Sequence, residues 1–419
     1  MDVRVSKLKE VMDLVKPAVP KNPSLKVLTN LCLKDGKVVA TDLETMVIVN
    51  MSEAKEPMLL PYSSVAEMLK YIPSYESLHI EQKGKNLQLT WLEGSASYPT
   101  EDYANFPVLP EMETRGESLL DGDVLITAMS DALPYAAKDD TRPVLTGITM
   151  VLGTPVEVAA GDAFRMSYKA LGLSFPLEET IIIPGRSAAI AEHVFKKTPR
   201  TPPSSADTLV QAITSKRMLR VALVGDKKFR MDFGTSASIF VNLIEGSPPA
   251  WLNLLPKGDP LMQCQLFAPQ LDAAARRVRD IAKENSGIVR MEFSDGHLKL
   301  SAKGDNQEIS TTTDTLLSNG EPARTAIDQK YLIEYLSGKQ GIITFSKYTD
   351  SGPVVFEYQN SPKVLIMPMA TKWDDEEPAA EETPAESEQD QSETVNSEEE
   401  SESSTDEAEE EVTEPAQTE

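Results

Sequence analysis

Hydrophobic residues recur at helical spacing near the start of three separate stretches of the chain. The three sets are Leu8, Val11, Met12 and Val15; then Leu125, Ala128, Met129 and Ala132; then Leu271, Ala274, Ala275, Val278 and Ile281. Apolar residues three and four positions apart share one face of a helix. The pattern therefore predicts an amphipathic helix at the start of each stretch.

Each predicted helix is followed by strand-like segments, one of which ends at an aspartate. DGKVVATD ends at Asp42, TPVEVAAGD at Asp162 and DGHLKLSAKGD at Asp305. A short carboxylate readily accepts hydrogen bonds from nearby backbone N–H groups. A residue that recurs once per unit in this setting fits a turn or cap better than a catalytic role.

A second helix is predicted after each of these aspartates, beginning at Pro61, Pro184 and Asp328. Proline suits the first turn of a helix and aspartate suits the N-cap. Each unit then closes with alternating strands: LHIEQKGKNLQLTWL, LRVALVGDKKFRMDF and IITFSKYTDSGPVVFEY.

The layout predicts an α+β fold of three repeated domains, each with two helices on one face of an antiparallel sheet. We place the domains at 1–117, 118–257 and 258–373. Separate domains, a closed ring and part of a ring all remain compatible with the pattern itself.

Charge is concentrated at one end of the chain. The formal net charge is −25, but residues 374–419 hold 21 of the 66 acidic residues and no Lys or Arg. Residues 1–373 keep 45 acidic against 41 basic residues, a net charge of −4. A strongly acidic segment with few large apolar residues cannot bury enough surface to fold, so 374–419 is predicted to be a disordered tail.

Several kinds of chemistry find no support in the sequence. There is no apolar run long enough for a membrane span, no signal-peptide pattern, and only Cys32 and Cys264, which favours a cytoplasmic protein without a disulfide framework. No phosphate-binding glycine motif appears, and His79, His193 and His297 lack metal-ligand spacing. We expect no cofactor, no metal and no catalytic residues. An enzyme stays an open alternative, because catalytic pairs need not be neighbours in sequence.

Three motifs follow one another in order along the repeats. The first is SLKVLTNLCL with DGKVVATDLE, and the second is TRPVLTG from Thr141 with VAAGDAFRM from Val158. The third is VLIMPM, which ends at Met369. Together they resemble the bacterial DNA polymerase III beta subunit, the DNA sliding clamp. The resemblance implies a non-enzymatic processivity factor for DNA replication. Two three-domain crescents would join head to tail as a homodimeric ring around double-stranded DNA, without reading its sequence.

The resemblance also implies a hydrophobic cleft between the second and third domains, in which short linear motifs of the polymerase and the clamp loader dock. The cleft residues carried over are Arg142, Leu145, Asp162, Phe164, Arg165, Met166, Pro249, Leu254, Tyr331, Leu365, Met367, Pro368 and Met369. Methionine adapts to varied side chains, and the two arginines are expected to anchor peptide carbonyls or acids. Ordinary core positions remain the alternative for Leu145, Met166 and Met367.

Basic residues on the predicted helices are candidates for contact with DNA phosphates. They are Lys9, Lys16, Lys196, Lys197, Arg200, Arg276, Arg277, Arg279 and Lys283. Such contacts give affinity without sequence readout. A solvated helix face is the alternative for all of them.

The chain departs from the family pattern at several points. Gly161-Asp162 stands for Thr-Asp, Ala163-Phe164 stands for Gly-His, and 50 residues follow Met369. We expect Phe164 to make the floor of the cleft bulkier or more apolar. Asp280 falls where the family tends to present an apolar residue to the neighbouring protomer. A second hypothesis is therefore a clamp paralogue that binds peptides as a scaffold or decoy without encircling DNA.

Overall fold

The computed structural model describes residues 1–107, 112–198, 217–294 and 296–373. Within it, Met1–Thr371 form one compact unit, distinct from Lys372–Glu419. Arg200 and the predicted tail at 374–419 lie outside the described residues.

The first repeat contains two helices and eight strands. Its elements are β1 (Asp2–Arg4), α1 (Val5–Val15), η1 (Lys16–Ala18), η2 (Lys26–Thr29), β2 (Asn30–Lys34), β3 (Lys37–Thr41), β4 (Thr45–Asn50), β5 (Met58–Pro61), α2 (Tyr62–Leu69), β6 (Ser77–Lys83), β7 (Asn86–Trp91), β8 (Gly94–Pro99) and η3 (Tyr103–Asn105).

The second repeat has the same order of strands and helices. It comprises β9 (Thr114–Asp121), α3 (Gly122–Ala132), η4 (Leu133–Tyr135), η5 (Pro143–Leu145), β10 (Gly147–Leu152), β11 (Glu157–Gly161), β12 (Arg165–Ala170), β13 (Glu179–Pro184), α4 (Gly185–Lys197), β14 (Met218–Val224), β15 (Lys228–Phe233) and β16 (Ala237–Asn242). A segment carrying the short helix α6 (Trp251–Leu254) leads to the third repeat.

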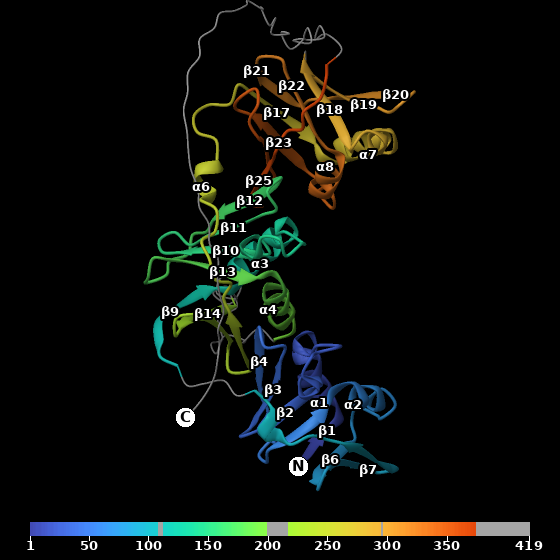
Figure 1. Ribbon diagram of the computed structural model, residues 1–419, viewed down its shortest axis with the longest axis vertical. Coiled ribbons are helices and arrows are strands. Elements are labelled where there is room, and N and C mark those ends of the chain that lie inside the picture. Colours follow the sequence, from blue (N-terminus) through green and yellow to red (C-terminus); the bar gives the residue numbers. More distant parts are fainter. Residues whose placement is uncertain (108–111, 199–216, 295, 374–419) are drawn as a thin grey trace, which may run out of the picture. The chain divides into compact units, whose positions relative to one another are not determined.

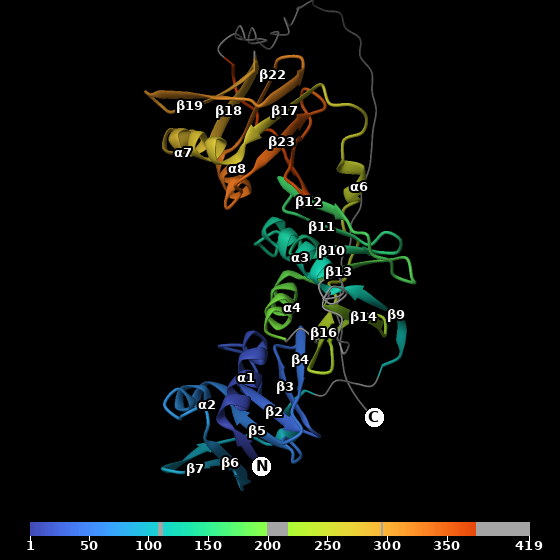
Figure 2. The same cartoon turned by 180° about the vertical axis from the view of Figure 1, so that it is seen from behind.

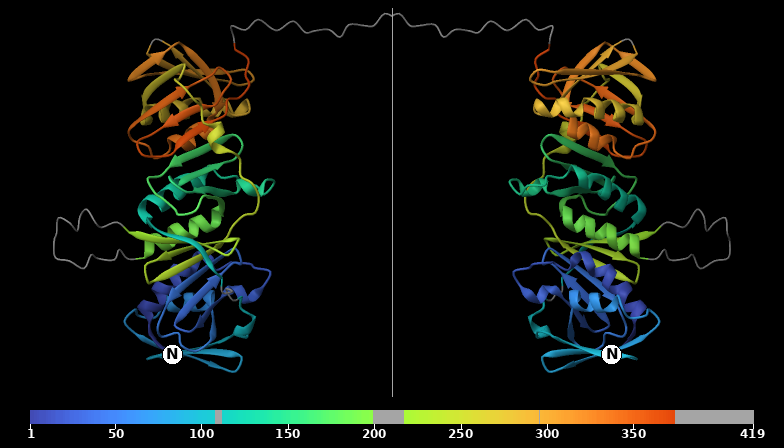
Figure 3. Two further views of the ribbon diagram at one scale, coloured as in Figure 1. Left: turned by 90° about the vertical axis from the view of Figure 1, so that its left-hand side faces the viewer. Right: turned by 90° about the vertical axis from the view of Figure 1, so that its right-hand side faces the viewer.

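The third repeat adds one strand, β21, to the same plan. Its elements are β17 (Met262–Phe267), α7 (Ala268–Glu284), β18 (Ile288–Ser294), β19 (His297–Lys303), β20 (Glu308–Asp314), β21 (Leu317–Gly320), β22 (Ala323–Asp328), α8 (Gln329–Leu336), β23 (Ile342–Lys347), β24 (Val354–Glu357) and β25 (Lys363–Ile366). The three repeats follow one another in chain order (Figure 3).

The predicted helices and strands are present, and the α+β fold is confirmed. The apolar stripes are buried on α1, α3 and α7, where only Ile281 is partly exposed. Pro61, Pro184 and Asp328 are the N-caps of α2, α4 and α8, so the two prolines lie one position earlier than the first helical residue. At the third, the Asp328 carboxylate accepts a 2.7 Å hydrogen bond from the Lys330 N–H.

The prediction of one sheet per repeat was incomplete, because the strands divide between two kinds of four-stranded sheet. In the first repeat the orders are β5-β2-β3-β4 and β1-β6-β7-β8. Neighbouring repeats share sheets: β4 pairs with β16 and β12 pairs with β25, both antiparallel. Period-two alternation predicts each strand but cannot say which strand it pairs with.

The shared sheets have one face on the helices and one face away from them. In the second repeat, Ile148, Met150, Val158 and Ala160 point toward the main core with α3 and α4. Helices α3 and α4 lie on one side of these strands and α6 on the other (Figures 1 and 2). Among the described residues, no helix is long and apolar enough to cross a membrane.

Candidate partner-binding site

A tight turn at Asp162, between β11 and β12, begins the predicted cleft. The Asp162 Oδ1 accepts hydrogen bonds from the N–H groups of Phe164 and Arg165, at 3.2 and 3.0 Å. Ala163 has φ 76°, a left-handed conformation that non-glycine residues rarely adopt. Asp42 makes the same turn, with Oδ1 accepting from the Glu44 and Thr45 N–H groups. Both aspartates are therefore turn residues, as predicted.

In the third repeat the register of this turn is shifted by one residue. The closing hydrogen bond runs from the Asp42 N–H to Thr45 and from the Asp162 N–H to Arg165, but from the Gly304 N–H to Gln307. Asp305 therefore lies inside the turn instead of at its first position.

Arg165 holds the joint between the second and third repeats. Its guanidinium donates to Asp162 Oδ2 at 3.1 Å, to Glu334 Oε2 at 2.6 Å and to the Pro134 carbonyl at 3.1 Å. The side chain is 4% exposed and lies over the Tyr331 ring, 4.5 Å from its centroid. Burial acts to lower the arginine pKa, but the two carboxylates outweigh it and leave that pKa raised. Arg165 therefore has internal partners, and its expected role in anchoring peptide groups stays a prediction.

Three predicted cleft residues form an apolar cluster on the sheet face away from the helices. Leu145, Met166 and Leu365 pack together there with Ala159, Val355 and Trp251, apart from the main core. Leu145 is 6% exposed, Met166 4% and Leu365 2%. Met367 is 46% exposed, so it is not a core residue.

The remaining cleft candidates lie around this cluster at varied exposure. Phe164 is 62% exposed and stacks on Tyr331, with ring centroids 6.5 Å apart, so it does not form the floor of the cleft. The Met367 N–H donates to the Phe164 carbonyl at 2.8 Å. Arg142 and Leu254 are exposed, whereas Pro249, Pro368 and Met369 are half-buried.

Sequence reasoning missed Trp251 and Glu334. Trp251 comes from α6 and is 8% exposed, packed against the floor residues. The sequence held one signal for it, a lone tryptophan inside the proline-rich segment PPAWLNLLP. Glu334 lies two residues before the end of α8 and shows no sequence pattern that would mark it as a partner of Arg165.

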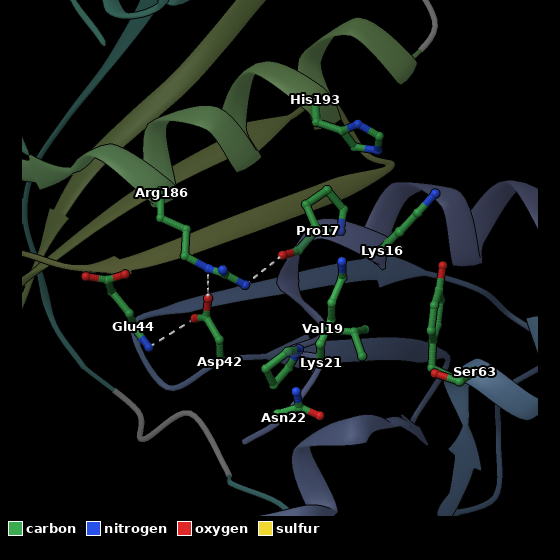
Figure 4. A pocket seen from close by; sticks show the side chains of 12 residues that line it. Lys16, Pro17, Val19, Lys21, Asn22, Asp42, Glu44, Ser63, Arg186 and His193 are labelled. Carbon is green, nitrogen blue, oxygen red and sulfur yellow. Dashed lines mark hydrogen bonds and ion pairs between the residues drawn. The ribbon is translucent and has the colours of Figure 1, made fainter. Parts of the chain in front are cut away.

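The first joint carries a related constellation with a different surface. Arg186 donates to Asp42 Oδ2 at 2.6 Å and to the Pro17 carbonyl at 3.2 Å, as Arg165 does to Asp162 and Pro134 (Figure 4). A cavity of about 1050 Å³ opens beside it. Its lining mixes both charges: Lys16, Pro17, Val19, Pro20, Lys21, Asn22, Asp42, Glu44, Tyr62, Ser63, Arg186 and His193. This joint therefore offers a polar hollow where the second joint offers an apolar cluster.

Most of the candidate DNA-facing residues have partners within the protein. Arg276 pairs with Asp272 at 2.7 Å, and both Arg279 and Lys283 pair with Asp280 at 3.3 Å. Lys196 pairs with Glu192 at 2.5 Å, and Lys197 with Asp13 at 2.8 Å. These pairs are exposed, so they are weak and leave the bases able to exchange partners.

Within the described ranges, the other three candidates have no acidic side chain as an ion-pair partner. Lys9 donates to the Ile72 carbonyl at 3.1 Å, and Arg277 donates to Thr311 Oγ1 at 3.3 Å. Lys16 lines the cavity at the first joint. Among the described residues, no group of three or more His, Cys, Asp or Glu side chains has the geometry of a metal site.

Comparison with known proteins was made at the level of sequence and of structure. No protein-family model matches the chain. It is 24% identical to the beta sliding clamp of Streptomyces coelicolor over 406 residues, covering 88% of this chain and 99% of that protein. It is 22% identical to the beta sliding clamp homolog GriR of Streptomyces muensis, covering 76% of this chain and 83% of that protein.

Solved structures of the same kind share the fold. The DNA polymerase III subunit beta of Pseudomonas aeruginosa superposes with a TM-score of 0.76 at 19% identity, covering 88% of this chain and 99% of that one. The clamp of the same organism bound to griselimycin superposes with a TM-score of 0.75 at 19% identity, with the same coverage.

Three repeats of one helix-and-sheet unit, joined through shared sheets, give the chain the fold of these clamp structures. The chain is similar in sequence to bacterial beta sliding clamps and shares their fold.

Proposed function

We propose that this protein is a DNA sliding clamp that encircles duplex DNA as a homodimer and tethers a DNA polymerase. It acts in the bacterial cytoplasm as a binding protein and not as an enzyme. The observation that carries the proposal is the repeated way in which strands join the repeats. Each repeat has one sheet of the kind β5-β2-β3-β4 and one of the kind β1-β6-β7-β8. The last strand of the first kind, β4 or β12, pairs with the last strand of the second kind in the next repeat, β16 or β25. We keep the predicted repeat boundaries at 1–117, 118–257 and 258–373, except that β9, which pairs with β14 in the second repeat, already begins at Thr114.

Two strands that should pair by this rule have no such partner within the described sheets. Strand β20 is the counterpart of β4 and β12, and β8 is the counterpart of β16 and β25. Both are edge strands of the described sheets. An open edge tends to pair with another strand. Pairing β20 of one protomer with β8 of another repeats the internal joints and closes a head-to-tail ring.

Retention on circular DNA tests the ring directly. Incubated with a bacterial clamp loader, ATP and nicked plasmid, the protein should stay on the circle through gel filtration. It should be lost when the plasmid is cut once, because a ring slides off a free end. Equal retention on circular and linear DNA would contradict encirclement and support the second candidate, a peptide-binding scaffold. That candidate is favoured by the internal pairing of the α7 bases with Asp272 and Asp280.

The cleft formed by Phe164, Tyr331, Met367 and the apolar cluster is proposed to bind a short linear motif of a polymerase or clamp loader. The double substitution Met367→Ala and Leu145→Ala should weaken binding of a polymerase-derived motif peptide by about 1 kcal/mol or more, about fivefold or more. Fluorescence anisotropy of a labelled peptide measures this change.

A surface leucine elsewhere provides the matched control for that experiment. Leu119 on β9 is 56% exposed, and Leu119→Ala should leave peptide affinity unchanged. Unchanged affinity in the folded double variant would move the peptide site away from this cluster.

The basic residues of α7 are proposed to face DNA. Reversing Arg276, Arg279 and Lys283 to Glu should lower loading onto DNA. It should also make the slope of log K against log salt less steep, because each phosphate contact contributes roughly 0.9 to that slope and up to about three contacts are lost. The readout is the retained protein at several salt concentrations.

A control of equal charge change uses three lysines that stand on strands or turns instead of helices. These are Lys83, Lys227 and Lys299, paired with Glu81, Glu245 and Glu292. If both triple variants show the same salt slope, net charge and not position controls binding, and α7 is a solvated face.

A further inference from the structure

Trp251 lies on the apolar floor of the proposed cleft. Its indole packs with Leu145, Met166 and Leu365, the three floor residues carried over from the clamp signature. The ring also covers Gly161, where an added Cβ would lie 2.9 Å from an indole carbon. A side chain of any size at position 161 would therefore push the indole away, so Gly161 provides the space that Trp251 fills.

The segment that carries Trp251 has few features that would fix it in place. Helix α6 is four residues long, Leu252 and Leu254 are 50% and 51% exposed, and only the partly buried Leu255 packs against the cluster beside Trp251 in this segment. Within the described part of the chain, the buried indole Nε1 has no hydrogen-bond acceptor. A buried donor without an acceptor opposes the gain from burying the ring. Trp251 therefore packs well against apolar side chains, but its buried N–H group lacks a hydrogen-bond acceptor among the described residues.

Space for the indole exists beside its present position. A cavity of about 500 Å³ adjoins it, bounded by the crossing segment and by the outer face of β10, β11, β12 and β13. Trp251 forms one wall, Pro249 and Leu252 lie on the same side, and Tyr168 and Thr149 lie across from them. The Thr149 Oγ1 is buried without a partner among the described residues. The cavity therefore borders the cluster through Trp251, Ala159 and Tyr168.

We propose that Trp251 is an internal ligand of the partner cleft, and that an aromatic or large aliphatic side chain of a linear partner peptide displaces it. The inference rests on the proposed function and adds its regulation. The floor now holds a flat aromatic side chain, so its shape and apolar character suit an incoming residue of the same kind. The rim residues Phe164 and Met367 are exposed beside it and are free to cover the newcomer. The displaced indole moves toward the adjoining cavity.

Only molecules in which Trp251 has left the floor can bind the peptide. The apparent peptide affinity is therefore the intrinsic affinity multiplied by the fraction of such open molecules. Substituting Trp251 with alanine removes the competitor, so peptide affinity should rise, on the order of tenfold if about a tenth of molecules are open. A role in fastening the segment alone predicts the opposite, because loss of the fastener disturbs the cleft. Asn253→Ala, on the exposed face of α6, is the matched control and should not change affinity.

The decisive measurement leaves Trp251 in place. The chain has three tryptophans, so Trp91→Phe with Trp373→Phe makes Trp251 the sole indole. A polymerase-derived motif peptide without tryptophan is titrated while its binding is followed separately through an anisotropy label. Displacement should shift the Trp251 emission to longer wavelength and raise its quenching by acrylamide, in step with binding.

The outcomes separate this inference from the proposed function. Binding with unchanged Trp251 emission and quenching overturns the displacement and leaves the cleft intact. Peptide that binds only to the Trp251→Ala variant supports displacement strongly. Absence of binding to both the parent and that variant overturns the displacement together with the peptide cleft, whereas retention on circular DNA would still report on the clamp.

Discussion

Replacing Arg165 with methionine should lower the free energy of unfolding by about 3 kcal/mol, the largest stability loss expected from a single polar side chain here. The methionine keeps the apolar stem but leaves Asp162, Glu334 and the Pro134 carbonyl without their shared donor. Removing one member of a buried ion pair typically costs about 3–5 kcal/mol. The lower end applies because the Glu334 side chain is 39% exposed and can regain water.

The arginine at the first joint is the matched control. Arg186 contacts the corresponding aspartate and proline carbonyl, but its side chain is 53% exposed. Arg186→Met should therefore cost about 1 kcal/mol or less. Urea unfolding gives the totals, and hydrogen exchange of the amides that pair β12 with β25 reports whether the second joint opens first. Equal losses in both variants would mean that burial of the guanidinium does not control the strength of the joint.

Local pattern was enough to predict the repeated units. The stripe from Leu271 to Ile281 marks α7 because helix period and burial depend on residues close in sequence. Asp328 marks the start of α8 for the same reason, since a cap is a local hydrogen bond. The strands were found as well, but their division between two sheets was not, because pairing joins residues as far apart as Val47 and Ile239.

The cleft was only partly predictable, for a related reason. Motif resemblance placed Leu145, Met166 and Leu365 together, and they do share one cluster. Arg165 carries the same resemblance but is buried by Glu334, which lies 169 residues away. Trp251 packs on the cluster through contacts that no spacing rule encodes. Functional side chains were therefore missed where a distant segment, and not the local motif, decides exposure.

The proposed ring closure leads to a second large effect, on assembly. In the β19–β20 hairpin, the Gly304 N–H donates to the Gln307 carbonyl at the turn, and the Thr315 N–H donates to the Gly296 carbonyl at the other end of the two strands. Antiparallel pairs alternate between bonded and non-bonded positions. The register then leaves the backbone groups of Glu308, Ser310 and Thr312 pointing to the open edge.

The same reasoning applies to β8. The Thr100 N–H donates to the Lys85 carbonyl. By the same alternation, the backbone N–H and C=O groups of Ser95 and Ser97 point away from β7, toward the open edge. At the first joint, Ile48 pairs with Ser238 and Met46 with Phe240. Transferring that register places Ser310 of one protomer opposite Ser95 of its partner, and Glu308 opposite Ser97.

Ser310→Pro should convert a dimer of twice 46.0 kDa into monomers. Proline removes the outward N–H and puts its ring into the joint, while the inward bonds of β20 to β19 stay intact. The N–H bond is lost directly, and the clash of the ring breaks the reciprocal bond of the same residue pair. Losing these two hydrogen bonds at each of two interfaces, at roughly 1 kcal/mol each, weakens the dimer by on the order of a thousandfold. Ser310→Ala keeps the N–H and should remain dimeric. Light scattering at micromolar protein measures the mass, and circular dichroism checks that both variants fold. A folded Ser310→Pro protein with an undiminished dimer would show that β20 does not form the joint, and Ser95→Pro would test the opposite edge in the same way.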